Sequence, residues 1–135
     1  MRIGTTLLTL LALSCSRCEF PTNVPPPPRA ERIQPRQEWR NLWADVEKCS
    51  GRSGNFDDVN WYRALEKMIN PEGEELAGRW IHPHNIYQAP ENIDEGSGWS
   101  QEYKNFNLGH EMLHDLLQTY GHPKQFDTCG LRYKP

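Results

Sequence analysis

Residues 110–114 read His-Glu-Met-Leu-His, and the spacing of these residues constrains the chain more than any other feature. An α-helix turns about 100° per residue, so His110 and His114 would lie on one face, one turn apart, where both imidazoles can bind a single metal ion. Glu111 would project about 100° away from His110, beside the metal rather than among its ligands. The pattern predicts a metal site with a carboxylate placed as the general base of a hydrolytic reaction.

The residues around this motif predict a helix of about four turns. Asn105 or Asn107 can cap its start, and Gly121 followed by Pro123 can end it. Apolar side chains recur at helical spacing on both sides of the motif, namely Phe106, Leu113, Leu116, Leu117 and Tyr120. The helix would therefore bury one side and present its histidines on another.

The segment from residue 106 to residue 122 resembles the active-site helix of the zincin superfamily of zinc metallopeptidases. The resemblance implies that His110 and His114 bind Zn²⁺, that Glu111 is the catalytic base that polarises the attacking water, and that a third protein ligand follows. Two well-known subgroup patterns are absent. Leu117 and Tyr120 stand where the metzincin pattern has Gly and His, and no Glu follows Glu111 to serve as the gluzincin ligand.

Three residues after His114 carry plausible donor atoms: Asp115, His122 and Asp127. Asp115 would point about 100° away from His114, which suits a carboxylate that orients an imidazole from outside the ligand set. We expect His122 to be the third metal ligand, because Gly121 can reverse the chain. Eight residues of straight helix rise about 12 Å, so the helix must end or bend after Leu117 for His122 to reach the metal. The alternatives are Asp127 as the ligand and His122 as a histidine that contacts the last helix carbonyls.

The N-terminal residues predict export. Residues 1–14 have Arg2, a short apolar stretch and small residues at the end, a pattern typical of a signal peptide and too short to span a bilayer. Residues 11–15 resemble a bacterial lipobox, which implies a cell-envelope lipoprotein anchored through Cys15; ordinary cleavage before Cys15, giving a secreted protein, is the alternative. With Cys15 lipidated, Cys18 would be left free or paired between molecules. Residues 15–35, with the run Pro25 to Pro28, predict a semi-rigid polyproline tether.

Residues 36–135 are sufficient for one modest core. Cys49 and Cys129 are the only cysteines in this range, and we predict that they form a disulfide, since disulfides persist in exported proteins. The alternative is two separate thiols. Such a bridge would tie the segment after His122 to the body of the domain, a constraint typically worth about 2–4 kcal/mol.

The pattern of the remaining residues predicts an α+β fold. Residues 36–49 carry apolar residues at helical spacing, and residues 59–62 favour a strand, with a short helix through Met68 as the alternative. Residues 76–81 and 85–89 predict two strands joined by His82, Pro83 and His84, and residues 90–100 predict a polar loop. We therefore expect a minimal zincin-like domain, in which a helix backs a small, mostly antiparallel sheet and the sheet lies across the motif helix. The resemblance implies that the edge strand nearest the metal binds substrate as an added strand, and the candidates for it are Asn85, Ile86 and Tyr87.

The expected function is zinc-dependent hydrolysis of a peptide or protein, with an oxyanion donor chosen from Tyr87, Tyr120 and Tyr133. The alternative is a metal-binding or interaction lipoprotein that keeps the fold without catalysis. His82 and His84 flank a proline in a turn, so we expect exposed loop histidines rather than ligands. Trp99, in the polar loop, is a candidate for a wall of the substrate cleft.

Charge and hydropathy exclude other classes of function. The chain has a net charge of −3, and removing residues 1–14 removes one arginine, which leaves about −4. No basic stripe could attract phosphate backbones, so nucleic acid is not an expected partner. Outside the leader no segment is apolar enough to enter a bilayer, so contact with a membrane would be through the lipid anchor alone. We expect a monomer.

Overall fold

The computed structural model describes residues 24–135. The predicted signal peptide, the lipidation at Cys15 and the state of Cys18 lie outside the described residues. The elements follow in the order β1 (Ala30–Ile33), α1 (Gln37–Ser50), the 3₁₀ turn η1 (Phe56–Asp58), β2 (Asn60–Ala64), β3 (Met68–Ile69), β4 (Glu75–Leu76), β5 (Gly78–Ile81), β6 (Asn85–Gln88), α2 (Pro90–Ile93), α3 (Gln101–Leu117) and α4 (Gln125–Thr128).

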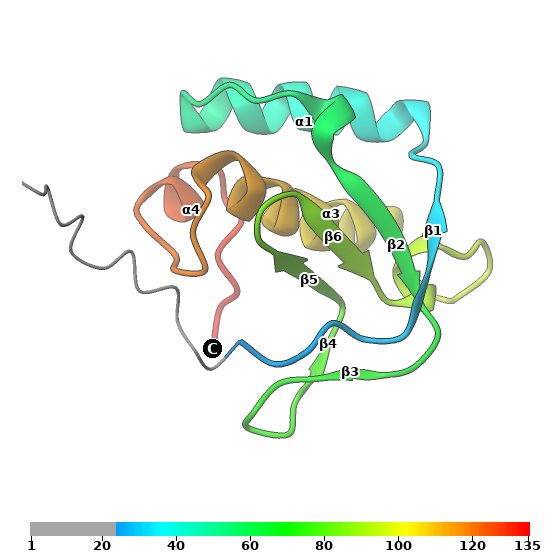
Figure 1. The fold of residues 1–135 in the computed structure, drawn as a ribbon. Coiled ribbons are helices and arrows are strands. Elements are labelled where there is room, and N and C mark those ends of the chain that lie inside the picture. The colour runs from blue at the N-terminus through cyan, green and yellow to red at the C-terminus, as the bar shows by residue number, and fades with distance from the viewer. Residues whose placement is uncertain (1–23) are drawn as a thin grey trace, which may run out of the picture.

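The fold is α+β, as predicted (Figure 1). Four strands form a mixed sheet in the order β1-β2-β6-β5, and β3 and β4 form a separate hairpin. β2 and β6 are parallel, whereas the other two pairs of the sheet are antiparallel. β1 lies inside residues 15–35, the range predicted to be a tether, and it pairs with β2 from Ala30 to Ile33. The sheet therefore begins within the segment that composition alone assigns to a linker.

Helix α1 confirms the prediction for residues 36–49. Trp39, Trp43 and Val46 recur on one face of the helix and are buried. Gly51 ends the helix with φ 69°, a left-handed conformation that glycine adopts without steric cost. The buried face of α1 packs on α3 and on one face of the sheet, and the core between them contains Trp39, Trp43, Phe56, Trp61, Trp80, Ile86, Leu108 and Met112.

Helix α3 carries the His-Glu-Met-Leu-His motif; its predicted cap and its stop near Gly121 are wrong, whereas the end after Leu117 that His122 required is present. Ser100 caps the start, where its side chain accepts a hydrogen bond from the backbone N–H of Tyr103, so neither Asn105 nor Asn107 is the cap. The helix ends at Leu117 rather than near Gly121, because Gln118 takes a left-handed conformation with φ 50°. The Gln118 side chain donates to the carbonyl of Pro83, 2.8 Å away, and ties this end of α3 to the turn between β5 and β6.

The strands predicted within residues 59–62, 76–81 and 85–89 are present as β2, β5 and β6. The candidate substrate strand is wrong, however, because β6 is hydrogen-bonded to β2 on one side and to β5 on the other. Asn85, Ile86 and Tyr87 therefore have no free strand edge to offer a peptide. β5 is the edge strand beside α3.

Cys49 and Cys129 form the predicted disulfide, with their Cα atoms 5.3 Å apart. The bond joins the end of α1 to the residue after α4, next to a small apolar cluster of Val46, Leu113, Phe126 and Leu131. A structural disulfide indicates that the protein folds in an oxidising compartment. Among the described residues no helix combines the length and the apolar character that crossing a bilayer requires.

Candidate metal centre

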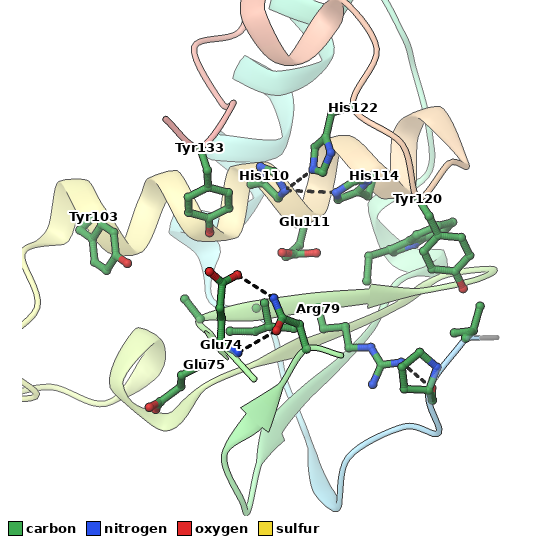
Figure 2. Close-up of a pocket in the computed structure, with 17 residues that line it drawn as sticks. Glu74, Glu75, Arg79, Tyr103, His110, Glu111, His114, Tyr120, His122 and Tyr133 are labelled. Carbon is green, nitrogen blue, oxygen red and sulfur yellow. Dashed lines mark hydrogen bonds between the residues drawn. The ribbon is translucent and has the colours of Figure 1, made fainter. Parts of the chain in front are cut away.

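Three imidazoles meet at the C-terminal half of α3 (Figure 2). His110 and His114 come from α3 itself, and His122 comes from the segment that turns back after the helix ends. The Nε2 atom of His110 lies 3.1 Å from the Nε2 atom of His114 and 3.1 Å from the Nε2 atom of His122. The early end of α3 at Leu117 is what lets His122 return to the level of the first two histidines.

The hydrogen bonds of the two helix histidines direct their Nε2 lone pairs at one another. His110 Nδ1 donates to the carbonyl oxygen of Leu131 at 2.6 Å, and His114 Nδ1 donates to that of Thr119 at 2.7 Å. Because a carbonyl can only accept, the proton of each neutral ring lies on Nδ1 and the lone pair lies on Nε2. Two imidazole ligands of a tetrahedral zinc ion are about 3.3 Å apart, close to the spacing found here. The three donors, which all lie within 4.8 Å of one another, are therefore placed to hold one metal ion.

The electrostatics of the cluster also favour a metal. Burial lowers the pKa of His110 to about 4 and that of His114 to about 3, and it lowers the pKa of His122 as well. All three rings are therefore neutral at pH 7, the form in which imidazole binds metals.

Phe126 of α4 forms the apolar support of this cluster. Its ring centroid lies 4.9 Å from that of His110 and 4.7 Å from those of His114 and His122. Neither Phe126 nor the two carbonyl acceptors were found by sequence reasoning. Phe126 and Leu131 lie beyond the helical periodicity, and Thr119 lies after the last residue of α3, so only the turn after α3 and the disulfide bring these groups to the histidines.

Glu111 lies next to the three imidazoles but is not one of the clustered donors (Figure 2). Its side chain points towards β5 and is only 5% exposed. A Cβ atom on Gly78 would lie 2.8 Å from Glu111 Cγ, so the absence of a side chain at residue 78 is what allows this close approach. Burial raises the pKa of Glu111 to about 8, and a hydrogen bond from the backbone of Trp80 partly opposes this shift.

The imidazoles and Glu111 lie at the base of a cleft of about 850 Å³. The β3–β4 hairpin and β5 form one side of it, and the other lining includes Tyr103, Tyr120 and Tyr133. Tyr87 is not in the cleft, because successive residues of a strand face opposite sides and its ring stacks on Tyr62 instead. Trp99 does not line the cleft either; it contacts Tyr103, which does.

The N-terminal end of the described chain lies at the rim of the same cleft. Val24 and Pro25 contribute to its lining. The guanidinium of Arg79, on β5, donates to the carbonyls of Pro25 and Pro26, the latter at 2.9 Å. The first residues of the proline run are therefore held against the domain.

Asp115 binds an imidazole, but not one of the clustered three. Its carboxylate accepts hydrogen bonds from Nδ1 of His84 and from the indole N–H of Trp80, both at 3.0 Å. The Trp80 ring lies parallel to that of His114, at 12° and 6.2 Å between centroids, so Asp115 supports the cluster through Trp80. Asp127, the alternative ligand, is paired with Arg132 at 2.6 Å and is not part of the cluster.

The raised pKa of Glu111 predicts how the stability of the metal-free protein depends on pH. Its pKa is higher in the folded state than the ordinary 4.5, so the carboxyl favours folding below pH 4.5 and this contribution is lost as pH rises through 8. The side-chain amide introduced by Glu111→Gln does not ionise in this pH range. We expect the variant to gain stability relative to the wild type by on the order of 5 kcal/mol between pH 4.5 and pH 9. Urea unfolding of both proteins in a chelator, across this range, measures the difference; a difference independent of pH would contradict the prediction.

Comparison of the chain with protein-family models, with curated protein sequences and with solved structures gives no match in any of the three. The geometry of the cleft and the sequence of α3 are therefore the basis for assigning a function.

Proposed function

We propose that this protein is a zinc-dependent, metalloendopeptidase-like hydrolase of peptide bonds, of the zincin type that the motif resembles. The observation that carries the proposal is the position of Glu111, beside three converging imidazoles, outside their donor set and facing the cleft. When bound by His110, His114 and His122, Zn²⁺ supplies a Lewis acid that acidifies water and polarises a carbonyl.

In this proposal Glu111 takes the proton of the attacking water and passes it to the leaving amine. Burial raises the pKa of Glu111 to about 8 in the metal-free protein, and the positive charge of a zinc ion beside it would lower this pKa and favour the carboxylate form that accepts the proton. We propose Tyr120 as the donor to the oxyanion. Its hydroxyl accepts from the backbone N–H of His82 at 3.0 Å, which leaves its own proton to donate, whereas the hydroxyl of Tyr133 donates to Asn107 Oδ1.

We propose β5 as the strand that receives the peptide. The backbone carbonyl of Ala77 accepts from Ala89 N–H on the β6 side. Because backbone groups alternate in an antiparallel pair, the carbonyls of Gly78 and Trp80 face the free edge. A substrate added along this edge would pass over Glu111, which contacts both residues.

The alternative is a non-catalytic metal-binding lipoprotein. A closed structural zinc site has four protein ligands, whereas a catalytic site keeps a position open for water or substrate. Among residues 24–135 the cluster contains three donors, which favours the enzyme.

The test combines metal analysis with peptide cleavage. Full-length protein loaded with one equivalent of Zn²⁺ is expected to cleave members of a peptide library, and 1,10-phenanthroline is expected to stop the cleavage. His122→Ala should lose both the zinc and the activity. Glu102→Ala is the control, because Glu102 is exposed and does not line the cleft, and it should retain both. Zinc-loaded wild type that cleaves no peptide would favour the alternative.

A further inference from the structure

Behind the cleft, four side chains form a continuous row of hydrogen bonds. The Tyr133 hydroxyl donates to Asn107 Oδ1 at 2.6 Å, and Asn107 Nδ2 donates to Asn92 Oδ1 at 3.1 Å. Asn92 Nδ2 in turn donates to Gln88 Oε1. The three amides are buried, and they join the C-terminal segment to α3, α2 and β6.

Gln88, the last residue of the row, has a side-chain donor that makes no hydrogen bond. Gln88 is 0% exposed, and its Nε2 atom has no hydrogen-bond partner. Its Oε1 atom is already used by Asn92, so the amide cannot turn over without breaking that bond. A buried donor without an acceptor lowers the free energy of unfolding by about 1–3 kcal/mol. Such an unpaired donor is therefore a candidate for a functional role.

This free donor faces the same space as Glu111. The position that a Cβ atom on Gly78 would take lies 3.0 Å from Gln88 Nε2 and 3.2 Å from Glu111 Oε1. Gly78 does not have a positive φ, so backbone conformation does not demand a glycine here. The missing side chain instead leaves a space that borders both the amide of Gln88 and the carboxylate of Glu111.

We propose that Gln88 is a positioning residue for Glu111, and that its Nε2–H group donates to the Glu111 carboxylate in the working enzyme. The inference rests on the proposed function, because it assigns the partner of the proposed general base. The backbone N–H of Trp80 supports the carboxylate from β5, and Gln88 supports it from β6. The row that begins at Tyr133 fixes the direction in which the Gln88 amide points.

The contact is tested first without any substrate. In the zinc-loaded full chain, the two Nε2 protons of Gln88 are followed by NMR in the wild type and in Glu111→Leu, which removes the acceptor. We expect their resonances to move upfield and their exchange with solvent to accelerate in the variant. Side-chain protons of Gln88 that are unchanged by Glu111→Leu would overturn the proposal.

The second test separates positioning from structure. Gln88→Met keeps the size of the side chain and removes the donor, and we expect kcat to fall roughly 10–100-fold at unchanged KM and zinc content. Gly78→Ala, which fills the shared space from the opposite side, should act in the same direction. Asn60→Ala is the matched control: it removes a side-chain hydrogen bond to Asn85 in the same sheet, away from the cleft, and should leave kcat unchanged.

The outcomes distinguish this inference from the proposed function. If the wild type cleaves no peptide, the peptidase proposal fails and the NMR experiment alone decides on the contact. If the wild type is active and folded Gln88→Met has the wild-type kcat, the positioning role is wrong and the peptidase proposal stands.

Discussion

Glu111→Gln is expected to lower kcat/KM for peptide cleavage by roughly 10²–10⁴-fold while the protein retains one equivalent of zinc. The amide has the shape of the carboxyl group but cannot take a proton from water. The three imidazoles are held by groups that the change does not touch, namely the carbonyls of Leu131 and Thr119 and the ring of Phe126. The cleavage rate should therefore fall while the zinc content stays the same. The decrease should be in kcat, because Glu111 acts on the reacting groups.

The matched control is Glu102→Gln, the same change in the first turn of the same helix. Glu102 is exposed and does not line the cleft, so its loss should leave both rate and zinc content unchanged. Cleavage of one chromogenic peptide, with zinc measured on the same samples, compares the three proteins. Equal rates for Glu111→Gln and the wild type would remove Glu111 from the mechanism.

Loss of the disulfide is expected to lower the free energy of unfolding. The bond closes a loop of 80 residues, for which the chain-entropy estimate is about 4–5 kcal/mol, and measured losses for native disulfides are typically 2–5 kcal/mol. We expect the double variant Cys49→Ser, Cys129→Ser to lose a free energy of unfolding in this range, measured by urea denaturation of the metal-free protein.

The same variant should also bind zinc more weakly. Cys129 directly follows α4, which carries Phe126, and lies two residues before Leu131, whose carbonyl holds the His110 ring. Freed from α1, this segment would support the imidazoles less firmly. Reduction of the wild type should reproduce both losses, and the double variant should not respond to the reductant. Full stability and zinc affinity in the double variant would mean that packing around Phe126 and Leu131 suffices.

The centre of the site could be predicted from local sequence. His110, Glu111 and His114 are placed by the geometry of one helix, and a local pattern fixes that geometry. His122 could be selected because few donors follow the motif, but its selection required α3 to stop near Leu117. No sequence signal marks that stop: Gln118, a residue without special preference for a left-handed conformation, ends the helix because its amide binds Pro83 across the fold.

The choice of edge strand shows where pattern reasoning ends. Residues 76–81 and 85–89 both have the character of strands, and either could have been the edge. The parallel pairing of β2 with β6 decides which strand is at the edge. This pairing places β6 inside the sheet and leaves β5 with one unpaired edge. β1 likewise lies in proline-rich sequence and becomes a strand only because β2 offers it an edge.

The sequence alone determined the local features, namely the helical spacing of two histidines and a glutamate and the apolar face of α1. It also determined the disulfide, because the domain has only two cysteines. The tertiary structure alone decided which distant groups meet, including Gly78 over Glu111, the free amide of Gln88, and the carbonyls that orient the imidazoles. The physical reason is that periodicity and propensity act over a few residues, whereas strand pairing, chain reversal and close packing depend on residues dozens of positions apart.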